Sequence, residues 1–126
     1  MMKITLTILL LVLYSSCATH KPQVFKTEKT EEPAQQISGL SYLIDEIDLA
    51  IQRNRFDRAA EIAQRGLRIT PDNAVLWQRL ALVELKLGNY AQAEQNALRS
   101  IRFSSENREL IGINNHLIAE ARALSD

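Results

Sequence analysis

The amino-acid sequence predicts an all-α protein, and three observations lead to this fold class. From residue 39 onward the chain contains a single proline, Pro71, so little there forbids long helices. Apolar and alanine residues recur at intervals of three and four, which is the spacing of one helix face, and no segment alternates as a strand would. The chain also repeats itself at a spacing of about 34 residues, which predicts two similar helix pairs.

Five helices are expected in this part of the chain, each with one apolar face. Thr70 before Pro71 predicts an N-terminal cap with proline in the first helical turn, and Asn89 followed by Gln92 resembles a capping box. In chain order, the five faces are Leu40, Leu43, Ile44, Ile47 and Ile51; Ala59, Ala60, Ala63 and Leu67; Val75, Leu76, Leu80, Val83 and Leu87; Ala93, Ala97 and Ile101; and Leu110, Ile113, Leu117, Ile118, Ala121 and Leu124.

The internal repeat rests on pairs of matched residues. A shift by one repeat length places Leu43 on Trp77, Ile47 on Ala81, Asn54 on Gly88, Phe56 on Tyr90, Ala59 on Ala93, Ala63 on Ala97, Gly66 on Ser100, Leu67 on Ile101 and Ile69 on Phe103. The small residues in this set are expected to let two helices approach closely, while Phe56 and Tyr90 fill the space beside each tight turn. A five-helix bundle with a coincidental period is the alternative.

The second copy resembles the tetratricopeptide repeat in Trp77, Leu80, Ala81, Gly88, Tyr90, Ala93, Ser100 and Phe103, and Pro71 closes the first copy as the late proline of that family does. The resemblance implies an α-α superhelix with repeats at about 40–71 and 74–105. A capping helix would follow over 106–124, with a polar outer face formed by Asn114, Asn115, His116, Glu120 and Arg122.

Four residues depart from the family pattern. Glu84 and Ala50 occupy a position where the family often has a large apolar or aromatic side chain. Asn54 replaces the turn glycine of the first copy, and Ser105 replaces the proline of the second. The first copy is the weaker match to the family pattern as a whole.

The N-terminal segment predicts export. Its apolar run extends from Ile4 to Tyr14, which is well short of the about 20 apolar residues that a membrane-spanning helix needs, and fits a signal peptide over residues 1–16. The stretch Leu13-Tyr14-Ser15-Ser16-Cys17 resembles the bacterial lipobox, in which the cysteine is lipidated and becomes the new N-terminus, although the family usually has leucine at the place of Tyr14. The alternative is an ordinary signal peptide with Cys17 as a chance thiol.

Residues 17–38 are expected to form the lipidated N-terminus and a flexible tether, because they contain few large apolar residues and many charged ones. The folded domain would then occupy residues 39–126. Ala18 follows the cysteine in place of aspartate, which by resemblance to enteric sorting implies the outer membrane, on its periplasmic face.

Composition and motifs predict a binding protein and not an enzyme. The net charge is zero, which provides no long-range attraction to nucleic acid. One cysteine and two histidines make a metal site unexpected, and no catalytic or cofactor-binding motif is recognisable. Arginines at positions 53, 55, 58, 65 and 68 alternate with acidic residues, which favours a solvated mixed-charge surface over a phosphate site.

The family resemblance implies a groove that binds a protein or peptide and is lined by the first helix of each pair. Glu109 and His116 would close it from the capping helix. We therefore expect a non-catalytic, lipid-anchored adaptor for an envelope partner that the sequence does not identify; the alternative is a structural lipoprotein that self-associates as a homo-oligomer. The groove residues implied are Ser41, Ile44, Asp48, Gln52, Val75, Gln78, Leu82 and Lys86.

Overall fold

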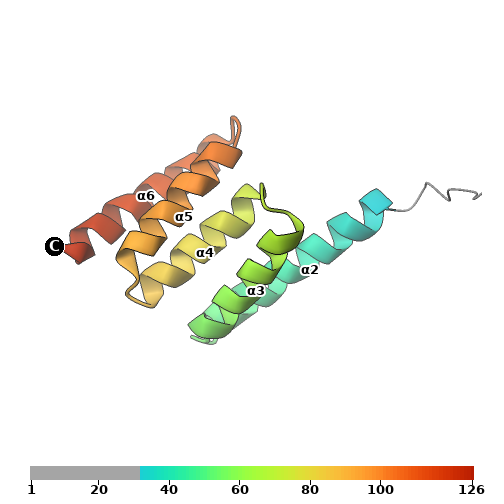
Figure 1. The fold of residues 1–126 in the computed structure, drawn as a ribbon, viewed down its shortest axis with the longest axis horizontal. Helices are drawn as coiled ribbons and strands as arrows, with labels where there is room; N and C mark the ends of the chain where they lie inside the picture. Colours follow the sequence, from blue (N-terminus) through green and yellow to red (C-terminus); the bar gives the residue numbers. More distant parts are fainter. Residues whose placement is uncertain (1–31) are drawn as a thin grey trace, which may run out of the picture.

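A computed structural model of the chain describes the backbone of residues 32–126 and the side chains from residue 39, and this part consists of five α-helices joined by short turns (Figure 1). The all-α prediction is confirmed for these residues. The helices are α2 (Glu32–Gln52), α3 (Phe56–Ile69), α4 (Ala74–Lys86), α5 (Tyr90–Phe103) and α6 (Arg108–Ser125).

The helices form two layers. Each helix contacts the next one along the chain, and α4 also contacts both α2 and α6. Figure 1 shows the helices succeeding one another across the molecule from α2 to α6, with α3 in front of α2 and α5 in front of α6. Helices α2, α4 and α6 therefore form one layer, and α3 and α5 form the other.

The helix boundaries reproduce the repeat that the sequence predicts. Helices α3 and α5 begin at one pair of matched residues, Phe56 and Tyr90, and end at another, Ile69 and Phe103. Helices α4 and α6 also begin one repeat apart.

Two turns also share a residue in the left-handed backbone region. Asn54 has φ 55° and Gly88 has φ 81°. These two residues are a matched pair of the repeat. Asparagine tolerates this left-handed conformation better than most residues, which explains how Asn54 replaces the turn glycine of the first copy.

Two asparagines cap the helices of the first layer in the same way. The side chain of Asn73 accepts a hydrogen bond from the Leu76 amide at 2.9 Å, and that of Asn107 accepts one from the Leu110 amide at 3.0 Å. Each bond satisfies one of the unpaired amides at a helix N-terminus. The two caps are again separated by one repeat.

Of the two caps expected from the sequence, the one at Thr70 is wrong and the one at Asn89 is confirmed in position but not in its side-chain bond. Thr70 ends α3 instead of beginning α4: its hydroxyl donates to the Gly66 carbonyl at 3.2 Å, and a turn separates it from Asn73. Asn89 does precede α5, but its side chain makes no capping bond and donates to Glu84 at 2.7 Å. In both cases the side chain bonds back to the preceding helix.

Helix α2 begins at Glu32, ahead of residue 39 where the folded domain was expected to start. Pro33 lies in the first turn of this helix, where its missing N–H leaves no hydrogen bond unmade. The last residues of the expected tether are therefore helical. The expected signal peptide, Cys17 and the rest of the tether lie outside the described residues.

Small residues allow the two layers to pack closely, as expected. Ala59, Ala63, Ala93 and Ala97 are all fully buried. At Gly66 a Cβ atom would lie 2.8 Å from Cδ1 of Leu76, closer than two carbon atoms can approach without a shift. Helices α3 and α4 are therefore in contact at a point where only glycine fits without rearrangement.

The capping helix α6 differs from expectation at Asn114. Its side chain is fully buried, and its Nδ2 donates to Ser100 Oγ on α5 and to the Leu110 carbonyl of its own helix, both at 2.8 Å. Residue 114 lies on the stripe that also contains Leu110 and Leu117, so helix phase turns it inward. Of the other residues expected on the polar face, Asn115, His116 and Arg122 are exposed and Glu120 is half-buried.

Among residues 32–126, none of the helices combines the length and the apolar character that crossing a lipid bilayer would require.

Candidate functional site

The residues expected to line a groove all lie on α2 and α4, the two neighbouring helices of the first layer. We call these residues the first-helix surface. Their exposure differs: Ser41, Gln52 and Lys86 are exposed, Ile44, Asp48, Val75 and Leu82 are half-buried, and Gln78 is buried. Glu109 and His116 are exposed on α6, which contacts α4.

An ion pair between the two helices joins part of this surface. Asp48 on α2 accepts two hydrogen bonds from Arg79 on α4, at 2.6 Å from Nε and 3.1 Å from Nη2. The remaining Arg79 nitrogen, Nη1, donates to Gln78 Oε1. Bidentate pairs of this kind fix both distance and orientation, so the pair positions one first helix against the next.

Gln78 consequently does not have the open position that was expected of it. Its side chain is 3% exposed and its oxygen is occupied by Arg79. Sequence reasoning missed Arg79 itself. The available signal was its separation from Asp48, 31 residues, which is close to one repeat and therefore brings the two residues together on neighbouring first helices.

Two apolar residues of the surface also contribute to the core. Ile44 packs against the cluster that contains Ile47 and Leu76, and Leu82 packs against the cluster that contains Ala81 and Leu85. Each is only half-buried, so part of each side chain faces solvent.

Residues 50–96 match the family model described as tetratricopeptide repeat. This range begins in the last turn of α2, spans α3 and α4, and ends within α5. The described part of the chain has a tetratricopeptide-like fold. No curated protein and no solved structure matches the chain.

Tetratricopeptide repeats generally mediate contacts between proteins and are typically non-catalytic scaffolds. The arrangement of α2, α4 and α6 in one layer is the one that such repeats produce when helix pairs stack. The alternative of a five-helix bundle with a coincidental period is therefore not supported.

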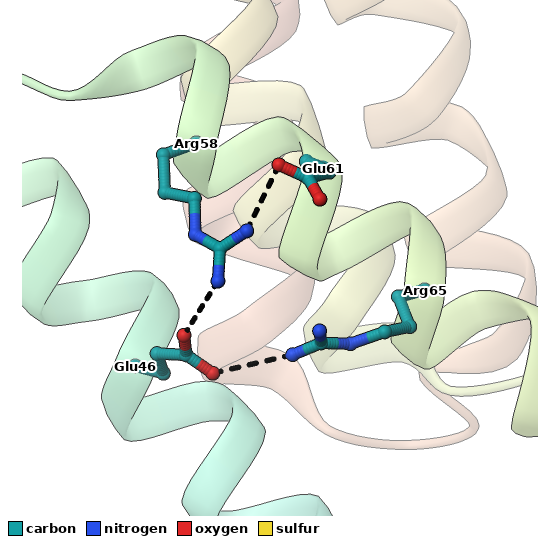
Figure 2. Close-up of polar contacts among 4 residues, drawn as sticks. All are labelled: Glu46, Arg58, Glu61 and Arg65. Atoms are coloured by element: carbon teal, nitrogen blue, oxygen red, sulfur yellow. Dashed lines mark hydrogen bonds and ion pairs between the residues drawn. The ribbon is translucent and has the colours of Figure 1, made fainter.

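Two arginines of the cluster predicted from the sequence form surface ion pairs on the five-helix array (Figure 2). Arg58 donates to Glu61 at 2.9 Å and to Glu46 at 3.2 Å, and Arg65 donates to the other oxygen of Glu46 at 3.3 Å. The hydrogen bond to Glu61, followed by the attraction of its charge, raises the pKa of Arg58 above its ordinary value. Two of the five arginines are thus paired with carboxylates, which agrees with a mixed-charge surface.

The N-terminal end of the array exposes apolar side chains that the repeat buries elsewhere. Tyr42 is 66% exposed and Leu49 is 43% exposed, whereas Leu76 and Val83, one repeat later, are completely buried. In the second copy α3 covers this face of the first helix, as the contact of Gly66 with Leu76 shows. On α2 no helix of the described chain covers the corresponding face.

Proposed function

We propose that the protein is a lipid-anchored adaptor of the bacterial cell envelope, which binds a partner protein through the first-helix surface and catalyses no reaction. The observation that carries the proposal is the layer of α2, α4 and α6, in which the bidentate Asp48–Arg79 pair fixes neighbouring helices. A surface whose geometry is fixed before binding loses less conformational entropy when a partner binds.

The exposed members of this surface provide its polar contacts. Gln52 and Lys86 occupy equivalent positions at the ends of α2 and α4, and both are exposed. Lys86 has no ion pair with any residue that the structure describes. A partner that provides carboxylates or carbonyl oxygens would complement it.

Partner capture tests this surface. We expect in-cell crosslinking of the wild-type chain to recover one envelope protein, and the double variant Gln52→Glu, Lys86→Glu to reduce that recovery by at least about tenfold. The matched control is Gln95→Glu, Arg102→Glu, which changes exposed residues of α5 by the same charge. Equal recovery with both double variants would exclude the first-helix surface as the binding site.

The anchor is tested by metabolic labelling with palmitate. We expect label on the wild-type chain and on Ser16→Ala, which keeps a small residue before the cysteine, and none on Cys17→Ala. Cys17 is the only cysteine, so residual label on Cys17→Ala cannot come from another thiol. Absence of label from a wild-type chain present at normal abundance would show that the lipobox resemblance is misleading.

Self-association is a second candidate function, favoured by the exposed Tyr42 and Leu49 on α2. A helix from another copy could cover this face as α3 covers α4, and two repeats are fewer than the three that such arrays usually need for stability. The crosslinking experiment separates the two functions. Recovery of the chain crosslinked only to itself would favour a structural homo-oligomer over an adaptor.

A further inference from the structure

A second candidate site lies outside the first-helix surface. A cleft of about 340 Å³ lies between α3, α4 and α5, and its lining includes Arg68, Trp77, Glu84, Asn96 and Arg99. None of these residues belongs to the first-helix surface. The cleft therefore requires its own explanation.

Two polar side chains of the cleft are largely buried, and each keeps a polar atom that makes no hydrogen bond within the described chain. These atoms are not sealed in the interior, so an occupant of the cleft can reach them. Asn96 is 3% exposed, and within residues 39–126 its side chain makes no hydrogen bond. Glu84 is 8% exposed; one of its oxygens accepts a hydrogen bond from Asn89 at 2.7 Å. The other oxygen has no partner, and the carboxylate makes no ion pair in the described part of the chain.

A carboxylate is an unusual side chain at this position of the repeat. In the equivalent position of the first copy stands Ala50, and the tetratricopeptide pattern often has a large apolar residue there. An apolar side chain at this position would fill the space. Glu84 instead offers a negative charge to an occupant of the cleft.

The rim of the cleft carries the opposite charge. Arg68 on α3 and Arg99 on α5 are exposed, and neither forms an ion pair with a described residue. The guanidinium of Arg99 lies 4.8 Å from the centre of the Trp77 ring. A ligand that matches the cleft therefore carries a positive group inside and negative groups at the mouth.

We propose that this cleft binds a lysine side chain of a partner protein, with acidic residues on both sides of that lysine. The ammonium group would donate to the free oxygen of Glu84 and to the amide oxygen of Asn96, and the aliphatic stem would lie along Leu67 and Trp77. The flanking carboxylates would reach Arg68 and Arg99. Arginine fits less well, because its planar group prefers both carboxylate oxygens and Asn89 already occupies one.

Trp77 is the only tryptophan of the chain and lines the cleft, so its fluorescence reports on this site. The probe is the pentapeptide acetyl-Ala-Glu-Lys-Glu-Ala-amide, added to the full chain. Its matched control contains norleucine, which keeps the aliphatic stem and lacks the charge. We expect a saturable change in emission with the lysine peptide and a Kd at least about tenfold larger with the norleucine peptide.

The variant Glu84→Gln removes the charge and keeps the size of the side chain, and its oxygen can still accept from Asn89. We expect it to abolish the preference for lysine over norleucine. Glu109→Gln on α6 is the control and should keep the preference, since Glu109 does not line the cleft. Thermal unfolding of both variants checks that the fold is retained.

Three results would overturn the proposal. The first is an equal Kd for the lysine and norleucine peptides, which would mean that the cleft recognises only apolar surface. The second is an unchanged preference in Glu84→Gln. The third is the absence of binding at millimolar peptide, established both by fluorescence and by equilibrium dialysis of labelled peptide. The double variant Gln52→Glu, Lys86→Glu should bind the lysine peptide normally, so this test stands apart from the adaptor proposal.

Discussion

Leu76→Ala is expected to lower the free energy of unfolding by about 3–5 kcal/mol, the usual cost of removing most of a buried leucine side chain. Leu76 is completely buried, and its Cδ1 occupies the space beside Gly66 where no Cβ fits. Its loss would leave a cavity between α3 and α4, at the junction of the two repeats. In a domain of this size the melting temperature should fall by more than about 10 °C.

Tyr42→Ala is the matched control, because Tyr42 occupies the same repeat position in the first copy but is 66% exposed. We expect it to change the free energy of unfolding by less than about 1 kcal/mol, measured by urea titration at low protein concentration. A similar loss of stability in Leu76→Ala and Tyr42→Ala would contradict the helix order described above. A loss in Tyr42→Ala that appears only at high concentration would instead show that a second copy covers α2.

The features that depend on the repeat were predictable from the sequence. The matched alanines predicted the close contact between layers, because a residue that recurs at one period in two copies meets the same surroundings in both. Asn54 and Gly88 share a left-handed backbone for the same reason. The positions of the first-helix surface on neighbouring helices follow from the same argument, while the binding of a partner to them stays a prediction.

The features that depend on a single turn or a single side chain were not predictable in this way. Thr70 was expected to cap α4, but the residues after it form a turn, so Asn73 takes that role. Gln78 was expected to face outward, but Arg79 reaches across to Asp48 and holds Gln78 as well. Such outcomes depend on where a long side chain finds a partner in space, which periodicity does not encode.

The cleft combines both kinds of feature. Its one sequence signal was the departure at Glu84 from the apolar residue that the family often has there. That signal did not reveal that Asn96, from another helix, would line the same cleft with no hydrogen bond from its side chain to a described residue. Glu84 forms a cleft with Asn96 only because α3, α4 and α5 meet there, which the sequence pattern does not show.

Asn114→Leu is expected to raise the free energy of unfolding by about 1–3 kcal/mol. The Oδ1 atom of Asn114 is buried without a hydrogen-bond partner, which is among the more costly arrangements in a protein interior. Leucine has nearly the same branched shape, and Leu80, one repeat earlier, is 5% exposed at the equivalent position. The substitution also removes the two hydrogen bonds that Nδ2 donates to Ser100 Oγ and to the Leu110 carbonyl. The Ser100 hydroxyl would keep its bond to the Ala74 carbonyl at 2.7 Å, so no new unpaired donor is created.

Two further variants separate the removal of a polar atom from other effects. Asn114→Ala removes the same oxygen but leaves a cavity, so it should lower the free energy of unfolding by about 1–3 kcal/mol. Asn115→Leu adds the same side chain at the neighbouring exposed position and should change stability by less than about 0.5 kcal/mol. A loss of stability in Asn114→Leu would mean that the hydrogen bonds of Asn114, either those of Nδ2 or one from Oδ1 to a buried water, outweigh the gain in apolar burial. Helix α6 would then be held by a polar contact where α4 is held by an apolar one.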